Sequence, residues 1–262
     1  MKTVLKYPGA KNRLAPWIAS HIPPHDVYLE PYFGSGAVFF NKTPARIETV
    51  NDLDGNVVNY FRVLRERPDE LIRLISLTPF GRDEYNSAYT GEGDSDIERA
   101  RKFAVRCWMG FGCGNLYRNG FRSSQRHTSP STTRMWGRLP ETIREASSRL
   151  LDAQIENLPA AELIKRYDTD DVFIYADPPY LPGTRKGYLY RHEMTEQEHR
   201  ELLELLLRHP GKVMISGYDS PLYRRMLAGW RMETHKSQAE CGLHRTECLW
   251  MNYDGTETVP VE

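Results

Sequence analysis

The sequence predicts an α/β fold, in which a parallel sheet with helices on both faces carries an inserted region that is mainly helix and loop. The chain has 262 residues, which is enough for one such domain and an insertion. Strand-like apolar runs alternate with glycine turns and helical spacing near both ends of the chain, whereas residues 80–150 lack this alternation. We therefore expect residues 1–78 and 151–262 to form the sheet domain, with residues 79–150 inserted.

The first block reads as strand, turn, helix and strand. Residues 26–30 are a short apolar run typical of a buried strand, and the turn Phe33-Gly34-Ser35-Gly36 follows it. Residues 37–40 are expected to begin a helix. Residues 47–51 read as the second strand, after which apolar side chains recur at helical spacing (Val57, Val58, Phe61 and Leu64). This order predicts a parallel crossover unit.

The second block starts near residue 155 and contains the clearest strand pattern, residues 172–176. Thr195 and Glu198 have the spacing of a capping box, which predicts a helix that ends at His209-Pro210-Gly211. The remaining expected elements are a strand over residues 212–216, a helix beginning at Ser220-Pro221 and a strand over residues 247–253.

The insertion is expected to hold helices near residues 96–109 and 141–150, joined by a long loop with scattered aromatic side chains. Its segment from residue 99 to residue 138 contains nine basic residues and no acid (Arg99, Arg101, Lys102, Arg106, Arg118, Arg122, Arg126, Arg134 and Arg138). The whole chain has no formal net charge. Two interpretations stay open, a local face that binds a polyanion and a solvated face balanced by acids elsewhere in the fold.

Composition excludes several classes of protein. No apolar stretch approaches the roughly 20 residues that cross a bilayer, and the N-terminus has no apolar signal segment. We therefore expect a mature, cytoplasmic protein. The four cysteines (Cys107, Cys113, Cys241 and Cys248) lack the spacing of a disulfide framework or a zinc site, so we expect free thiols and no bound metal.

Asp177-Pro178-Pro179-Tyr180 directly follows the 172–176 strand and is the most informative motif of the chain. The prolines have no N–H and restrict φ, which leaves backbone carbonyls at the strand end without ladder partners. A carboxylate, a carbonyl and an aromatic ring can together bind a planar group that bears an exocyclic amine, such as a nucleic-acid base. Tyr180 could instead be a core aromatic, but the two prolines favour an exposed ring.

A second candidate site follows the first strand, where Gly34 and Gly36 allow close approach of the backbone to a ligand. Asp52, at the end of the next strand, has the position that accepts ribose hydroxyls in nucleotide-binding folds. Asp52 could also cap the following helix, and Asp54 could share either role. Phe39 replaces the third glycine of the dinucleotide fingerprint, which disfavours an ordinary NAD site.

Taken in order, these motifs resemble the Dam-type family of DNA adenine methyltransferases, from about residue 4 to residue 253. The segments that carry the resemblance are Lys6–Lys11, Glu30–Gly36, Asn51-Asp52, the basic insertion and Asp177–Tyr180, with smaller echoes at Tyr188-Leu189-Tyr190 and Arg245–Trp250. On composition alone, the Lys6–Lys11 segment would read as a basic loop before a helix.

The resemblance implies a Rossmann-like methyltransferase sheet that binds S-adenosyl-L-methionine at the carboxyl ends of its strands. The residues at the matching positions are Tyr7 and Lys11, which would enclose the cofactor, Phe33, Gly34 and Gly36 beside its methionine part, Asp52 at its ribose, and Asp177 between cofactor and substrate. The implied partner is double-stranded DNA, and the implied state is a monomer.

The implied reaction is methyl transfer to N6 of an adenine flipped out of the duplex, with Asp177, Pro178 and Tyr180 as the catalytic group. Asp177 and the Pro178 carbonyl would each accept one N–H of the amine, and Tyr180 would stack on the base. No cysteine follows a proline, which argues against methylation at cytosine C5. Methylation at cytosine N4, or a relative that binds DNA without catalysis, remains as an alternative.

The insertion would then recognise the DNA target, with Arg118, Arg122 and Arg126 among its DNA-binding residues. Arg118 falls where the family has a base-reading arginine, whereas Cys113 stands where the family has a tyrosine that wedges into the helix. Because of this departure, the resemblance does not extend to a particular recognition sequence.

Overall fold

The computed structural model describes residues 2–90, 95–112, 117–123, 131–184, 189–238 and 244–255. The strands are β1 (Val27–Glu30), β2 (Ile47–Asn51), β3 (Ala153–Glu156), β4 (Val172–Ala176), β5 (Lys212–Tyr218), β6 (Arg231–Gln238) and β7 (His244–Met251). The helices are α1 (Ala15–Ala19), α2 (Gly55–Glu66), α3 (Pro68–Leu77), α4 (Arg82–Ser87), α5 (Asp96–Met109), α6 (Thr132–Gly137), α7 (Leu139–Leu150), α8 (Ala160–Arg166), α9 (Glu196–Arg208) and α10 (Pro221–Met226). None of the helices in these ranges is both long and apolar enough to span a membrane.

All seven strands form one sheet in the order β3-β2-β1-β4-β5-β7-β6. Strands β1 to β5 pair in parallel, and β7 pairs antiparallel with both β5 and β6. From β1 the next strands in the chain, β2 and β3, are added on one side, whereas β4 and β5 lie on the other side of β1. The strand order therefore reverses between the neighbours β1 and β4. In open α/β sheets, ligands bind at such a reversal, outside the carboxyl ends of the strands.

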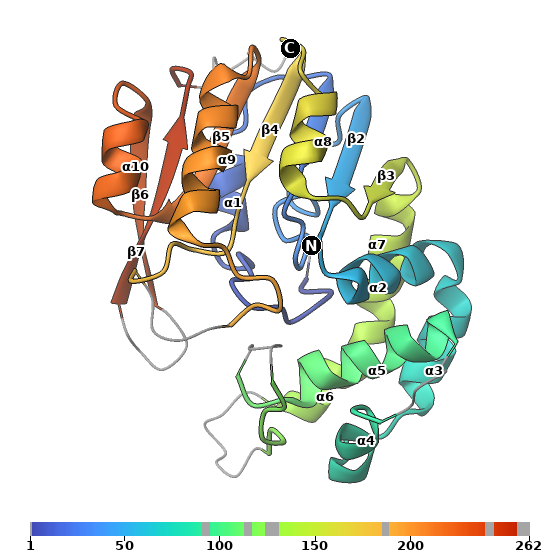
Figure 1. The fold of residues 1–262 in the computed structure, drawn as a ribbon. Coiled ribbons are helices and arrows are strands. Elements are labelled where there is room, and N and C mark those ends of the chain that lie inside the picture. Colours follow the sequence, from blue (N-terminus) through green and yellow to red (C-terminus); the bar gives the residue numbers. More distant parts are fainter. Residues whose placement is uncertain are drawn as a thin grey trace.

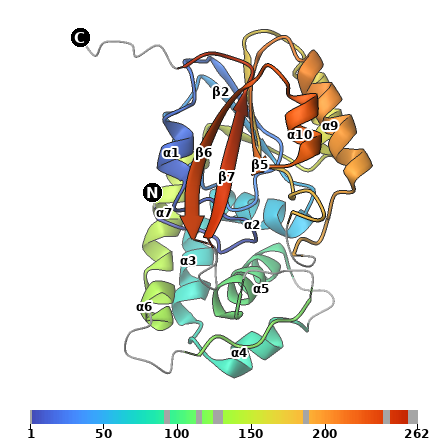
Figure 2. The ribbon, with the colours of Figure 1, turned by 90° about the vertical axis from the view of Figure 1, so that its left-hand side faces the viewer.

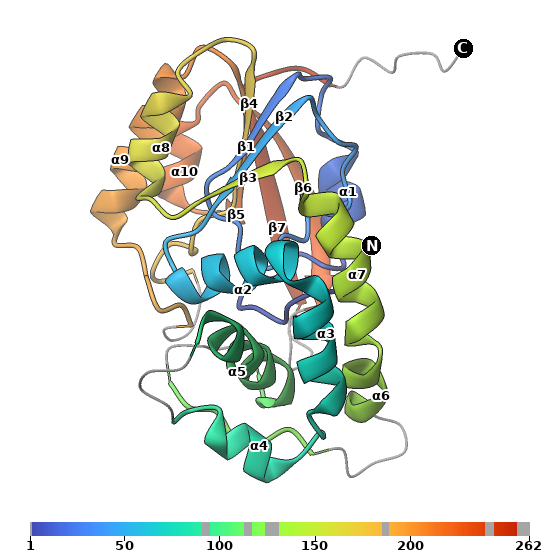
Figure 3. The ribbon, with the colours of Figure 1, turned by 90° about the vertical axis from the view of Figure 1, so that its right-hand side faces the viewer.

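Alternating side chains of the central strands divide between two apolar cores. On one face, residues such as Leu29 and Ile174 pack with α8, α9 and α10. On the other face, residues such as Tyr28 and Phe173 pack with the N-terminal segment, α1, α2 and α7 (Figures 2 and 3). Helices therefore cover both faces, and the predicted α/β class is confirmed.

Helices α3 to α6 extend beyond the carboxyl ends of the parallel strands (Figure 1). Helix α3 packs on α7, and α5 packs on α2. A buried carboxylate joins α7 to the sheet, because Glu48 of β2 accepts hydrogen bonds from Lys42 (Nζ to Oε1, 2.5 Å) and from Arg149 of α7 (Nη2 to Oε1, 2.7 Å). The predicted helix over residues 96–109 coincides with α5.

One predicted helix is wrong. Residues 37–40 form only a turn, in which the Phe40 N–H donates to the Gly36 carbonyl over 3.0 Å. All four side chains of this turn are buried, whereas a helix at the edge of a domain turns one face to water. In addition, Pro44 disfavours a helical conformation at Thr43 and so prevents the turn from continuing. Strand β6 has no counterpart among the elements expected from the sequence.

Candidate active site

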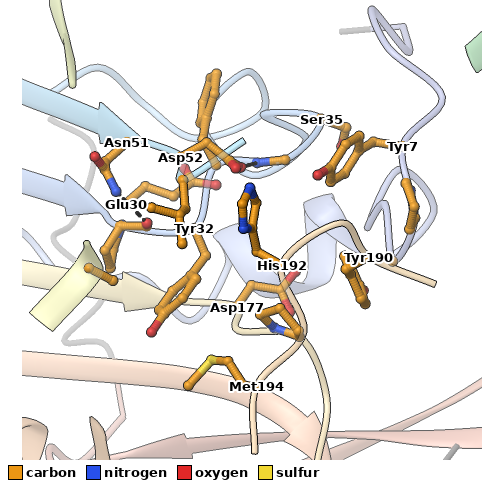
Figure 4. A pocket seen from close by; sticks show the side chains of 18 of the residues that line it. Tyr7, Glu30, Tyr32, Ser35, Asn51, Asp52, Asp177, Tyr190, His192 and Met194 are labelled. Atoms are coloured by element: carbon orange, nitrogen blue, oxygen red, sulfur yellow. Dashed lines mark hydrogen bonds between the residues drawn. The ribbon is translucent and has the colours of Figure 1, made fainter. Parts of the chain in front are cut away.

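A cavity of about 290 Å³ lies at the carboxyl ends of β1, β2 and β4, where the strand order reverses. Its walls come from the turns after these strands, from the N-terminal segment 7–11, from the start of α8 and from residues 190–194 before α9. Figure 4 shows Glu30, Asp52 and Asp177 around this space, with Tyr7 and Tyr190 on its opposite side. Cavity-lining residues therefore include members of every cofactor motif expected from the sequence (Tyr7, Lys11, Phe33, Gly34, Asp52 and Asp177).

The glycine turn after β1 has the backbone conformation that its sequence requires. Gly34 and Gly36 have φ values of 51° and 68°. A Cβ atom on Gly36 would lie 2.6 Å from the ring of Phe33 and 2.7 Å from that of Phe40. The turn is also fixed to β2, because the Gly34 N–H donates to Asp52 Oδ2 over 2.7 Å. Gly36 itself does not line the cavity and shapes the turn from behind, through its packing on Phe33.

Asp52 and Asp54 have separate roles. Asp54 is the N-cap of α2 and accepts the Asn56 N–H over 3.0 Å. Asp52 lines the cavity and accepts N–H groups from Gly34 and, at Oδ1 over 2.8 Å, from Asp54. Desolvation raises the pKa of Asp52 to about 7, against an ordinary value of 3.8. The helix-cap alternative for Asp52 is therefore wrong, and its carboxyl is an acceptor at the cavity wall.

Glu30 is a second cavity carboxyl, to which the sequence analysis assigned no role. It is the last residue of β1, is 2% exposed, and accepts the Tyr28 hydroxyl at 2.7 Å. Burial raises the pKa of Glu30 to about 8. The signal in the sequence was a charged residue that closes an otherwise apolar strand.

Asp177 extends from the end of β4 and has a partner on each carboxylate oxygen. Ser216 of β5 donates to Oδ1 over 2.7 Å, and Lys11 Nζ lies 2.9 Å from Oδ2. Although burial lowers the pKa of Lys11, the Asp177 and Glu247 carboxylates outweigh that effect and hold it above its usual range. The side chain of Asp177 remains 17% exposed and lines the cavity. Lys11, expected to enclose a cofactor, thus also forms an ion pair with the candidate catalytic acid.

The expected exposure of Tyr180 is wrong. Its side chain is 7% exposed, its hydroxyl donates to Glu247, and its ring meets the ring of Tyr218 edge-on at 4.5 Å. Burial is favourable because the Glu247 carboxylate of β7 accepts a hydrogen bond from the phenol hydroxyl. Pro178 is also buried, and Asp177 and Pro179 are the motif residues that line the cavity.

The segment before α9 closes one side of the cavity. Glu193 Oε1 accepts the N–H groups of Leu189 (2.6 Å) and Tyr190 (3.0 Å), which fixes the shape of this segment. Tyr190 lies against Gly9, where an added Cβ would be 2.1 Å from the tyrosine hydroxyl oxygen. His192 points into the cavity toward Asp52 (Figure 4). The sequence had indicated Tyr190 only as part of a minor echo of the family, and it gave no sign of His192.

Acids outside the basic segment neutralise part of it. Arg99 pairs with Asp96, and Arg101 pairs with Glu98 (2.6 Å) and with Glu84 (3.1 Å). This part of the segment therefore fits the interpretation of a solvated, balanced face.

The arginines assigned to DNA contact occupy different environments. Arg118 is exposed and donates to the side chain of Asn86, while Arg122 donates to the Gly110 carbonyl over 3.0 Å. Arg126 lies outside the described residues, as does Cys113. The DNA-binding roles of Arg118, Arg122 and Arg126 therefore stay predictions.

Comparison with known proteins identifies the family of the chain. The family model described as D12 class N6 adenine-specific DNA methyltransferase matches residues 7–240. The chain is 25% identical over 263 residues to the type II methyltransferase M1.LlaDCHI of Lactococcus lactis subsp. cremoris, an alignment that covers 91% of this chain and 88% of that protein. It is 24% identical to the DNA adenine methylases of Salmonella typhi and Escherichia coli strain K12, with 85% of this chain and 83% of each relative covered. A site built around Asp177 at the end of β4, together with a match over most of the chain, places this protein in the D12 class of N6 adenine-specific DNA methyltransferases.

Proposed function

We propose that this protein transfers a methyl group from S-adenosyl-L-methionine to N6 of an adenine that is flipped out of double-stranded DNA, with Asp177, Pro178 and Tyr180 as the catalytic group. The observation that carries the proposal is the position of Asp177. Its carboxylate lies between Ser216 and Lys11 at the wall of a cavity whose other walls hold the glycine turn, Glu30 and Asp52.

The cavity suits this cofactor in the chemistry of its walls. Glu30 and Asp52 present two desolvated carboxyl groups, and the raised pKa of each marks a group that gains from a cationic or hydrogen-donating ligand. An α-ammonium group would favour ionised Glu30, and ribose hydroxyls would donate to Asp52. The turn at Gly34, which lines the cavity, leaves the backbone open to the methionine part. When bound, S-adenosyl-L-methionine supplies an electrophilic methyl group on a sulfonium.

The residues of the chain act on the target amine. The lone pair of an adenine amino group is delocalised into the ring, which makes it a weak nucleophile. Asp177 and the Pro178 carbonyl each accept one of its N–H bonds, so the lone pair localises on nitrogen. Fixed acceptors of this kind lower the barrier by orientation and by preorganised dipoles. The amine loses its proton only after the methyl group has been transferred, so no base is needed before attack.

Residues 79–150 are proposed to bind the DNA target, while residues 1–78 and 151–262 form the catalytic domain. The placement of α4 to α6 beyond the carboxyl ends of the strands supports this division, because a duplex bound by these helices would lie at the end of the sheet where the cavity is (Figure 3). Arg118, Arg122 and Arg126 are the proposed phosphate or base contacts, and the protein is proposed to act as a monomer.

Asp177→Asn tests the assignment, because the amide removes the charge and places a donor where an acceptor is needed. Duplex DNA incubated with methyl-labelled cofactor is digested to nucleosides, which are separated by chromatography. We expect labelled N6-methyladenine from the wild type, a loss of at least about 100-fold in the variant, and cofactor affinity within a few-fold in calorimetry.

Label in N4-methylcytosine would support the alternative target, and no cofactor binding by the wild type would support a non-catalytic relative. Full activity of Asp177→Asn would reject the catalytic role of this residue. Glu204→Gln, on the exposed side of α9, is the matched control, and we expect it to retain wild-type activity.

A further inference from the structure

Glu247 of β7 is a buried carboxylate that the mechanism above does not use. Its neighbours on the same face of the strand, Leu249 and Met251, belong to the apolar core, and Glu247 itself is 3% exposed. Burying a charge in such a row is costly unless the group is paired. Glu247 contacts Tyr180, which ends the catalytic motif, and Lys11, which pairs with Asp177 of that motif.

The first partner shows that Glu247 sets the position of the Tyr180 ring. The Tyr180 hydroxyl donates to Glu247 Oε1, and the same ring meets Tyr218 edge-on. Tyr218 of β5 pairs in register with Glu247, so β5 and β7 together determine where the ring lies. Removing the carboxylate would leave a buried phenol without this acceptor.

The second partner connects Glu247 to Asp177. Lys11 Nζ lies 3.7 Å from Glu247 Oε1, 2.9 Å from Asp177 Oδ2 and 3.0 Å from the Gly9 carbonyl oxygen that accepts its hydrogen bond. It also lies 4.6 Å above the centre of the Tyr180 ring. One ammonium group is therefore shared by two carboxylates, and loss of Glu247 would leave Asp177 as the carboxylate beside it.

We infer that Glu247 is a positioning residue for methyl transfer, which holds the Tyr180 ring and the Lys11 ammonium in fixed places beside Asp177. This inference rests on the proposed function. Because Tyr180 ends the Asp177-Pro178-Pro179-Tyr180 motif, a displaced ring would also shift the backbone that carries the Asp177 and Pro178 acceptors. A lysine that is free to move further onto Asp177 competes with the target amine for the same acceptor oxygen.

Single-turnover methylation tests the inference, with cofactor affinity and thermal unfolding measured on the same proteins. Glu247→Ala should lower the single-turnover rate roughly 10- to 100-fold, as expected when reacting groups are misplaced by a fraction of an ångström to an ångström. Its dissociation constant for S-adenosyl-L-methionine should change several-fold less than the rate, since Glu247 does not line the cavity and reaches it through Lys11. Glu247→Gln keeps an acceptor for Tyr180 and should recover part of the lost rate.

A double-mutant cycle adds a readout that a merely structural role would not move. If Glu247 acts through the Tyr180 hydroxyl, Tyr180→Phe combined with Glu247→Ala should cost little more rate than the larger single loss. Glu233→Gln, a surface residue of β6 paired with Arg231, is the matched control and should retain the wild-type rate.

The inference fails if Glu247→Ala keeps the wild-type rate, if the two losses multiply, or if rate, cofactor affinity and thermal stability fall together. If Glu247→Ala does not fold, Glu247→Gln decides, because a reduced rate at unchanged cofactor affinity supports the inference and a wild-type rate overturns it. A wild-type protein that forms no N6-methyladenine would instead reject the proposed function.

Discussion

Glu30 and Asp52 show at the level of single residues how the cavity is prepared for a ligand. Each carboxyl is held in a desolvated wall, where its ionised form is disfavoured, and burial is the largest cause of the raised pKa in both cases. This arrangement costs folding stability, and a ligand with an ammonium group and hydroxyl donors would recover it. The two buried carboxyl groups therefore lower the folding stability and raise the affinity for such a ligand.

The pKa of Glu30 gives a test by pH. Its folded-state value of about 8 lies above the ordinary 4.5, so between about pH 5 and pH 8 the folded protein holds a proton that the unfolded chain has lost. The free energy of unfolding should therefore fall as pH rises through this window, by at most about 1.4 kcal/mol per pH unit for this group. Glu30→Gln should remove that part of the slope. Urea denaturation of both proteins between pH 5.5 and pH 8.5 measures the difference.

Asp52 contributes a slope of the same sign, but it is present in both proteins and cancels from the comparison. Parallel stability curves for wild type and Glu30→Gln would mean that Glu30 ionises normally in the fold. That result would also remove the argument that the Glu30 carboxyl is stabilised in its ionised form by binding a cationic ligand.

The N-terminal segment and the segment before α9 pack against each other at one side of the cavity. The N-terminal segment contributes Tyr7 and Gly9, and the segment before α9 contributes Tyr190, whose ring lies 6.4 Å from that of Tyr7. The Tyr7 hydroxyl reaches back to Asp54 Oδ2 at 3.4 Å, which links the pair to the start of α2. The contacts of Tyr190 with Tyr7 and Gly9 join segments about 180 residues apart in the sequence, so they depend on tertiary packing.

Gly9→Ala tests this contact. Its φ of 70° is a conformation that favours glycine, and the new Cβ would displace the Tyr190 hydroxyl. We expect the dissociation constant for S-adenosyl-L-methionine to rise on the order of tenfold, equivalent to about 1.4 kcal/mol, in calorimetry.

Gly229→Ala is the control for backbone strain alone. Gly229 has a φ of 93° and no atom within 4 Å of an added Cβ, so this variant should lose some thermal stability and keep its cofactor affinity. Equal losses of affinity in the two variants would show that contact between the loops does not shape the site.

Local signals determined which elements the sequence could predict. Strand β4 and helix α9 were predicted because an apolar run and a capping box are encoded by neighbouring residues, and both appear in the structure as expected. The helix over residues 37–40 was wrong because burial of four successive side chains is decided by the packing around the turn. Tertiary packing also decided the burial of Tyr180, which needed a carboxylate from a strand 67 residues away.

The same distinction applies to the site. Motifs with local spacing gave Asp52, Asp177 and the glycine turn, all of which border one cavity or shape its wall. Ser216 and Glu247 could not be found in this way, because each acts through a contact made when β5 and β7 join the sheet. Residues that support a catalytic group are commonly invisible to motif reasoning for this reason.

At the scale of the whole molecule, an uncharged chain must bind a polyanion through a local surface. The positive charge that the basic segment of the insertion offers to DNA is smaller than its nine cations indicate, because Arg99 and Arg101 are already paired with acids. Counterion release should therefore be driven by only part of the segment, including exposed Arg118. This explains how a protein with no net charge could bind DNA without coating it indiscriminately.

Salt dependence of DNA binding tests this division of charges. If Arg118 contacts a phosphate, Arg118→Ala should reduce the slope of log K against log salt by about 0.9, the value for one phosphate contact on duplex DNA. Arg99→Ala should leave the slope within experimental error, because the exposed Arg99 guanidinium is balanced by Asp96. Fluorescence anisotropy of a labelled duplex between about 50 and 200 mM salt gives both slopes. A reduced slope for Arg99→Ala with none for Arg118→Ala would place the DNA-binding surface along α5, because only a cation in contact with phosphate changes the number of counterions released.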